Sequence, residues 1–198
     1  MRLFVAIAPP AEVLDELDNL AAPLRAARSD LRWTSRAAWH VTLAFLGEVE
    51  ERAVDQLIPR LERAAHRHEA ISLAFSGAGA FPAPDRANVL WSGISGDRRG
   101  LAGLAQSVAA GAGRAGAAPP DKGRRFQPHL TLARCRLPAD VSGIVTALED
   151  FHGRFWHASD IHLVRSQLNG ASRPAPGTSP RYTTIQSWPL RNVAADRH

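Results

Sequence analysis

Two short segments of the chain share a pattern of residues that could carry acid–base chemistry. The segments are HVTLAF, from His40 to Phe45, and HLTLAR, from His129 to Arg134, and they differ only at their second and last positions. Chance accounts poorly for two such copies in one chain, because the chain's own frequencies of His, Thr and Leu together predict far fewer than one His-x-Thr-Leu segment. The repeat therefore indicates a chain with two halves built on a similar plan.

Each copy combines an imidazole with a hydroxyl. Both segments have the composition of a β-strand, and side chains two residues apart on a strand lie on the same face. His40 would then lie beside Thr42, and His129 beside Thr131, while the leucines turn into a core. If the two strands meet between two lobes, the cleft holds two imidazoles and two hydroxyls that face one another.

Such a set of groups suits the cleavage of a phosphodiester. One proton must leave the attacking oxygen and another must reach the departing oxygen, and a histidine with its pKa near 6.5 can do either at neutral pH. Threonine hydroxyls and a nearby arginine could donate hydrogen bonds to the phosphate oxygens as charge develops. A zinc site is disfavoured, because no HxxxH or HExxH spacing accompanies these histidines and threonine is not a usual zinc ligand. We therefore expect neither a metal ion nor a cofactor.

The elements that must position these groups alternate between strands and helices. Apolar and β-forming runs predict strands over 2–8, 31–34, 40–46, 71–75, 88–94, 128–134, 155–168 and 182–188. Apolar residues at helical spacing predict a first helix after Pro9 and Pro10, and further helices over 50–68, 99–113 and 141–148. A Gly- and Pro-rich turn joins 71–75 to 88–94 as a hairpin, and 115–125 and 169–180 are predicted loops.

This order of elements appears twice and favours a two-lobed α+β protein formed by residues 1–198 as a single unit. No apolar run is long enough to span a membrane, and the N-terminus lacks a signal-peptide pattern, so we expect a cytoplasmic protein without a membrane partner. Cys135 is the single cysteine, which excludes an internal disulfide and a cysteine-based zinc cluster.

The charge of the chain is compatible with anionic partners. Lys and Arg number 24 against 19 Asp and Glu, which gives a net charge of +5. All but one of the basic residues are arginine, whose planar guanidinium suits phosphate recognition. Because the arginines are spread along the chain, codon bias explains them equally well.

The paired motifs, together with RLFVAIAPP at residues 2–10, resemble the two-histidine phosphoesterase superfamily, and within it the bacterial and archaeal RNA 2′,3′-cyclic phosphodiesterases, historically called 2′-5′ RNA ligases. The likeness runs from Arg2 to SWPL at 187–190, and the FxPHLTLAR form at 126–134 is especially specific. It implies a bilobal α+β fold with two pseudo-symmetric lobes of mainly antiparallel sheet, outer helices and both motifs in a central cleft. It also implies hydrolysis of an RNA 2′,3′-cyclic phosphate end to a 2′-phosphate.

The same resemblance implies roles for single residues. His40 would be the proton donor to the leaving 3′ oxygen, and His129 the proton acceptor that activates water. Thr42, Thr131 and Arg134 would hold the phosphate. The two imidazoles are similar enough to exchange roles, and strict alternation along a strand would turn Arg134 away from His129 unless the strand ends or bulges there.

Phe45 stands in the first motif where Arg134 stands in the second, so the two halves differ in function. Phe45 either fills core or helps to wall a base pocket, because aromatic faces stack on unpaired RNA bases. The further candidates for base stacking are Trp33, Trp39 and Tyr182.

Several related functions remain open at this point. An RNA 5′ hydroxyl could replace water in the same site, which would give 2′-5′ RNA ligation, although orienting a second strand costs entropy that water does not. A small cyclic nucleotide or an ADP-ribose cyclic phosphate could be the substrate, or the chain could be a non-catalytic RNA-end binding module. DNA is excluded as the cyclic substrate because it lacks the 2′ hydroxyl, and we expect a monomer.

Overall fold

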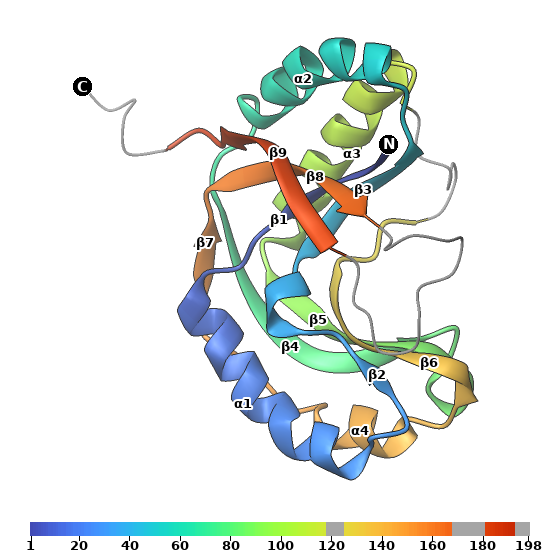
Figure 1. Ribbon diagram of the computed structural model, residues 1–198. Helices are drawn as coiled ribbons and strands as arrows, with labels where there is room; N and C mark the ends of the chain where they lie inside the picture. Colours follow the sequence, from blue (N-terminus) through green and yellow to red (C-terminus); the bar gives the residue numbers. More distant parts are fainter. Residues whose placement is uncertain (118–124, 168–180, 193–198) are drawn as a thin grey trace.

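A computed structural model describes residues 1–117, 125–167 and 181–192 (Figure 1). The predicted loop at 169–180 and most of the one at 115–125 lie outside the described residues. No helix in the described part of the chain is long and apolar enough to cross a membrane.

One curled antiparallel sheet of nine strands forms the framework of the protein. The strand order is β7-β4-β5-β6-β3-β1-β8-β9, and β2 pairs with β6 beside this path. The strands are β1 (Arg2–Ile7), β2 (Arg32–Trp33), β3 (Val41–Glu48), β4 (Ile71–Phe81), β5 (Ala87–Gly96), β6 (His129–Ala139), β7 (Trp156–Ala158), β8 (Asp160–Gln167) and β9 (Arg181–Pro189). The chain is therefore α+β, as predicted, with mainly antiparallel pairing.

The two motif strands meet in the middle of this sheet. β3 and β6 pair through Val41 and Leu130, the residues that directly follow the two histidines. In an antiparallel pair, the residue before one partner lies opposite the residue after the other. His40 therefore lies opposite Thr131, and Thr42 lies opposite His129. The joint between the two lobes therefore lies between the two motifs.

Four helices cover the sheet: α1 (Ala11–Ala27), α2 (Glu51–Ala65), α3 (Arg98–Arg114) and α4 (Ser142–Ala147). Helices α2 and α3 lie side by side near β3 and β9, and α1 lies beside α4 (Figure 1). Arg28, at the end of α1, donates a hydrogen bond of 3.0 Å to the carbonyl of Asp140 before α4. Helix α3 follows β5 of one lobe but packs against β3 of the other, so the lobes exchange helices.

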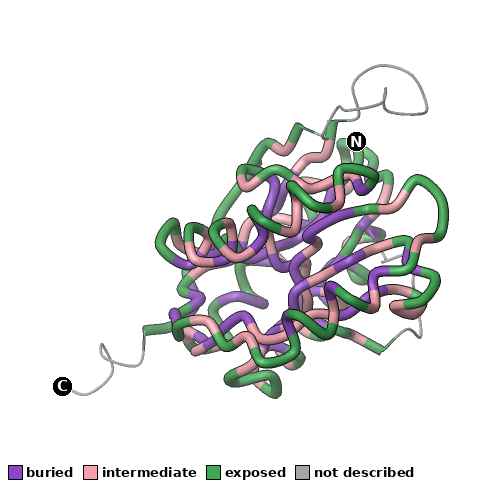
Figure 2. The backbone as a smooth tube through the Cα atoms, turned by 90° about the horizontal axis from the view of Figure 1, so that it is seen from below, coloured by how far each residue is buried: buried purple, intermediate pink, exposed green. Residues whose placement is uncertain are grey.

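β1 is buried on both of its faces, which explains its nearly unbroken apolar sequence. Leu3, Val5 and Ile7 belong to the large core that continues through both lobes. Phe4 and Ala6 face the other way into a small separate apolar cluster beneath the first motif. Buried residues accordingly lie mainly along the middle of the molecule, and exposed residues lie mainly around it, on the helices, the turns and the outer strand β9 (Figure 2).

The predicted elements are present, but three strands were delimited wrongly. β4 continues to Phe81 instead of ending at Phe75, because it pairs with β5 from Leu73 to Phe81. β6 continues past Pro138 to Ala139, which still pairs with β5. The predicted strand 155–168 is two strands, because β7 pairs with β4 at one end of the sheet and β8 pairs with β1 in the other lobe.

Candidate active site

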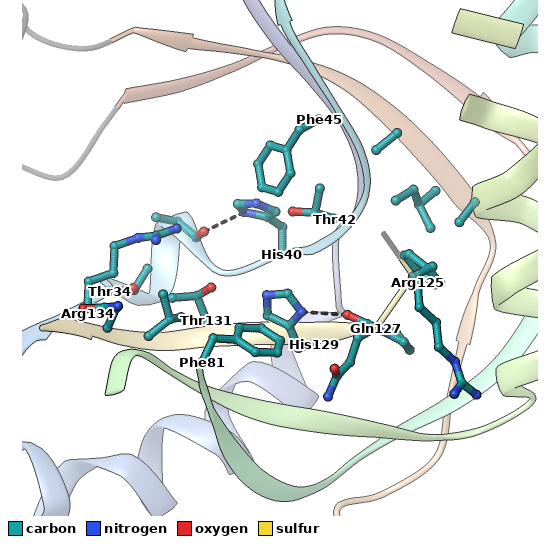
Figure 3. A pocket seen from close by; sticks show the side chains of 18 of the residues that line it. Thr34, His40, Thr42, Phe45, Phe81, Arg125, Gln127, His129, Thr131 and Arg134 are labelled. Carbon is teal, nitrogen blue, oxygen red and sulfur yellow. Dashed lines mark hydrogen bonds between the residues drawn. The ribbon is translucent and has the colours of Figure 1, made fainter. Parts of the chain in front are cut away.

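A cleft of about 1840 Å³ contains both motifs. Its lining includes His40 and Thr42 from the strand β3 region and His129 and Thr131 from β6. The two imidazoles and the two hydroxyls gather around the same space, as Figure 3 shows. The sequence-predicted convergence of the two motifs is therefore present in the structure.

Each histidine is held by the backbone in the same way. Nδ1 of His40 lies 2.8 Å from the carbonyl oxygen of Ala38, and Nδ1 of His129 lies 2.8 Å from the carbonyl oxygen of Gln127 (Figure 3). A carbonyl can only accept, so Nδ1 carries the proton in the neutral form of both rings. Nε2 of each ring is then the free nitrogen, which can take up a proton and release it again.

Aromatic side chains enclose both imidazoles. The ring of His40 stacks on Phe4 with the centroids 4.7 Å apart, and Tyr182 meets it edge-on at 5.2 Å. The ring of His129 meets Phe81 edge-on at 5.1 Å and lies 6.1 Å from Trp91. The imidazoles are therefore held on two sides, by a carbonyl and by rings, which fixes their orientation.

The surroundings favour the neutral form of both histidines. Burial lowers the pKa of His40 below its ordinary value, and the charges of Arg134 and His129 lower it further, against the opposing effect of the Ala38 carbonyl. Burial also lowers the pKa of His129, with Arg134 acting in the same direction and the Gln127 carbonyl opposing it. A proton on one ring therefore disfavours a second proton on the pair.

A bulge in β6 brings Arg134 to the cleft. The register of β6 against β5 shifts between Thr131 and Ala133, and Leu132 and Ala133 are both buried. Alternation restarts after this point, so Arg134 lies on the face of His129 and lines the cleft. From the sequence, Arg134 could reach the phosphate only if the strand ended or bulged before it, and the bulge is present.

β3 has a bulge at the equivalent point of its motif. Its register against β1 shifts between Thr42 and Ala44, and Leu43 and Ala44 are both buried. Phe45 is thereby turned to the cleft face, where its side chain is 50% exposed. A phenylalanine so open to solvent does not fill core, and this leaves a role in the cleft.

The other predicted aromatic residues are divided by the structure. Trp33 and Tyr182 line the cleft. The indole Nε1 of Trp33 donates a hydrogen bond of 2.9 Å to the carbonyl of Arg28, so its polar edge is already used. Trp39 is only 5% exposed and belongs to the core, which contradicts its assignment to a base pocket.

Several cleft residues were missed by the sequence analysis. Thr34, on the segment after β2, places a third hydroxyl near Thr131 and Arg134 (Figure 3). Phe81 comes from the predicted turn, and nothing in its sequence position indicates a contact with a histidine. Gly79 leaves room for the indole of Trp91, the ring beside His129, because a Cβ at this position would collide with it.

The cleft is strongly basic. Among the described residues its lining includes no aspartate or glutamate, and its arginines are Arg32, Arg98, Arg99, Arg125, Arg134 and Arg136. No group of three or more His, Cys, Asp or Glu side chains in the described ranges is arranged to hold a metal ion. The lining of the cleft therefore favours an anionic ligand.

Comparison with known proteins agrees with this geometry. A model of the LigT like phosphoesterase family matches residues 7–91 and 94–174. The chain belongs to this family. An Escherichia coli protein named RNA 2′,3′-cyclic phosphodiesterase is 31% identical over 96% of this chain and 96% of its own length.

Solved structures of LigT-like proteins have the same fold as this family member. A Thermus thermophilus crystal structure matches with a TM-score of 0.78 and 27% identity, over 98% of this chain and all of the other. The structure of E. coli LigT complexed with 3′-AMP matches with a TM-score of 0.73 and 27% identity, over 96% and 97% of the two chains. The bilobal fold expected from the paired motifs is thereby confirmed.

Proposed function

We propose that this LigT-like protein hydrolyses the 2′,3′-cyclic phosphate at an RNA 3′ end to a 2′-phosphate. The observation that carries the proposal is the pair of imidazoles held alike, each with its Nδ1 on a backbone carbonyl and its Nε2 free in a basic cleft. The name of the E. coli relative and the 3′-AMP complex of its LigT support RNA as the substrate.

In the proposed reaction His129 takes a proton from water, and the oxygen of that water forms a bond to phosphorus. The bond from phosphorus to the 3′ oxygen breaks, and protonated His40 gives its Nε2 proton to that oxygen. The product is a free 3′ hydroxyl beside a 2′-phosphate. One histidine gains a proton and the other loses one, so the pair must exchange a proton with solvent before the next turnover.

Thr42, Thr131 and Arg134 are the proposed contacts of the non-bridging phosphate oxygens. They lie on the same cleft face as the histidines, and hydrogen bonds to those oxygens gain strength as charge builds on them. Arg134 can donate two hydrogen bonds at once because its guanidinium is planar. Phe45, with its exposed ring, is the proposed platform for the terminal base, with Tyr182 and Trp33 along the same cleft.

The other functions that the sequence left open use the same groups. Ligation replaces water by an RNA 5′ hydroxyl, and its second strand must be held as well as the first. The predictions of a cytoplasmic monomer that does not act on DNA stay predictions.

The deciding experiment incubates the protein, in excess EDTA, with an RNA that ends in a 2′,3′-cyclic phosphate. Chromatography against authentic standards then identifies the product. We expect a 2′-phosphate from the wild type, and no turnover above background from His40→Ala or His129→Ala. Formation of a 3′-phosphate, an absolute need for a divalent metal, or full activity of either variant would contradict the proposal.

A further inference from the structure

A second pocket lies between α2 and α3, outside the catalytic cleft. It has a volume of about 370 Å³ and is lined by Arg60, Arg63, Ala64, Arg67, Ser107 and Arg114. Arg60 and Arg63 belong to α2 and Arg67 lies in the turn just after it, and their spacing of three and four residues places them on the same side. We call Arg60, Arg63, Arg67 and Arg114 the α2–α3 arginine cluster.

The cluster has no acidic counterpart. No carboxylate is among the described residues that line the pocket, and none of the four guanidinium groups forms an ion pair with another described residue. Nε of Arg60 is buried and has no hydrogen-bond partner there. Other arginines of the chain do pair with carboxylates, namely Arg25, Arg28, Arg36, Arg52, Arg154 and Arg191.

Close packing of the two helices forces these charges together. A Cβ at Gly111 of α3 would lie 3.3 Å from the carbonyl oxygen of Arg60, so a larger residue would push α2 away. His68, just after α2, also holds α3, because its Nε2 lies 2.8 Å from the hydroxyl of Ser107. Four like charges in so small a space repel one another, and an anion would relieve that repulsion.

Helix α3 borders both this pocket and the catalytic cleft. Arg98, Arg99 and Gln106 line the cleft, whereas Ser107 and Arg114 line the second pocket. The helical spacing places Gly103 and Ala110 on the surface between the two pockets, where Gly103 is half-buried and Ala110 is exposed. A polymer that leaves the cleft across α3 meets small uncharged residues first and the cluster next.

We infer that the α2–α3 arginine cluster binds backbone phosphates of the RNA substrate, at nucleotides away from the cyclic end. This inference rests on the proposed function. Arg63 and Arg67 are exposed, which suits contacts with successive phosphates without regard to sequence. A site for a small free anion would instead need several buried, fixed donors, whereas of the four arginines only Arg60 is half-buried, with its Nε out of contact with solvent.

The test compares two substrates with the same cyclic end: a dinucleotide, which cannot reach the cluster, and an RNA long enough to cross α3. The variant is Arg63→Glu with Arg67→Glu, and Arg63→Gln with Arg67→Gln is the neutral version. Reversal of Arg52 and Arg154, two exposed and ion-paired arginines outside both pockets, is the control for the change in total charge. Thermal unfolding of each protein checks that the fold is kept.

We expect the charge-reversed variant to raise KM for the long RNA about tenfold or more, while kcat/KM for the dinucleotide stays at the wild-type value. Removing two phosphate contacts should also reduce the slope of log affinity against log salt by about 1.4, from a slope of roughly 0.7 per contact for single strands. The KM of the neutral variant for the long RNA should lie between those of the wild type and the charge-reversed variant. The control should leave KM for both substrates unchanged.

Equal KM values for the long RNA in the wild type and the charge-reversed variant would overturn the inference, and an equal rise in the control would do the same. A third arm titrates inorganic phosphate into the His40→Ala protein with and without the α2 substitutions. Phosphate binding that depends on Arg63 and Arg67, without an effect on long RNA, would replace the RNA site by a free-anion site. Failure of the wild type to cleave the dinucleotide would instead contradict the proposed function.

Discussion

Phe45 and Arg134 occupy equivalent positions in the two halves of the protein, each turned into the cleft by a bulge directly before it. The same backbone device thus presents a flat apolar ring on one side and a forked cation on the other. A nucleotide end has two such parts, a base and a phosphate. On the proposed function, the near-symmetric scaffold would thus serve an asymmetric ligand.

Arg134→Ala should lower kcat/KM for the cyclic phosphate by about a hundred- to a thousandfold, the range for loss of one donor to developing charge. Arg134→Lys should recover only part of this loss, because an ammonium group cannot make the paired contact. Arg136→Ala is the control, since Arg136 also lines the cleft from β6 but is not in the motif. A loss equal to that of Arg134→Ala in the control would contradict a specific role of Arg134.

The pH dependence should follow the proton shared by the two histidines. Raising the pH through the upper apparent pKa removes the acid, and lowering it through the lower one protonates the base, so kcat/KM is bell-shaped. Because burial and Arg134 lower both pKa values, the alkaline limb should be centred below 6.5, the ordinary histidine value. Arg134→Gln removes a positive charge and should move that limb to higher pH, and an unmoved limb would contradict the assignment.

Phe45→Ala should weaken binding of substrates that carry a base. Stacking of one base on an aromatic ring contributes about 1–3 kcal/mol, which is roughly a five- to hundredfold rise in KM. Phe155→Ala is the matched control, because Phe155 is 66% exposed and does not line the cleft. If both variants change KM by the same factor, Phe45 is no base platform.

Leu130→Ala should destabilise the joint between the lobes. The side chain of Leu130 is fully buried where β6 meets β3, and truncation of such a leucine costs about 2–5 kcal/mol in the free energy of unfolding. Leu137→Ala, on the same strand but 79% exposed, should change it by no more than about 0.5 kcal/mol. Urea unfolding of both variants measures the difference, and equal losses would contradict this view of the joint.

The sequence predicted the chemical groups better than their surroundings. His40, Thr42, His129 and Thr131 could be found because a repeated motif records local alternation along a strand. The bulge before Arg134 could be stated only as a condition, since a bulge is set by the register against a partner strand.

The rest of the site depends on contacts between distant segments. Phe81 belongs to the predicted turn and reaches His129 only because β4 continues six residues further than its composition indicates. Phe4 and Tyr182 stand at opposite ends of the chain, and only the β1–β8–β9 pairing brings them to His40. Trp39 was a candidate for the base pocket and is instead buried, because the sequence alone does not distinguish it from Trp33.

The exchange of helices between the lobes bears on how the polypeptide acquires its structure. During synthesis from the N-terminus, α1 is complete before α4, its neighbour in the finished fold, has been made. β3 is likewise synthesised before α3, the helix that packs against it, because α2, β4 and β5 come between them in the chain. We therefore expect that neither half of the chain folds stably when it is expressed alone, whereas the two halves expressed together should assemble.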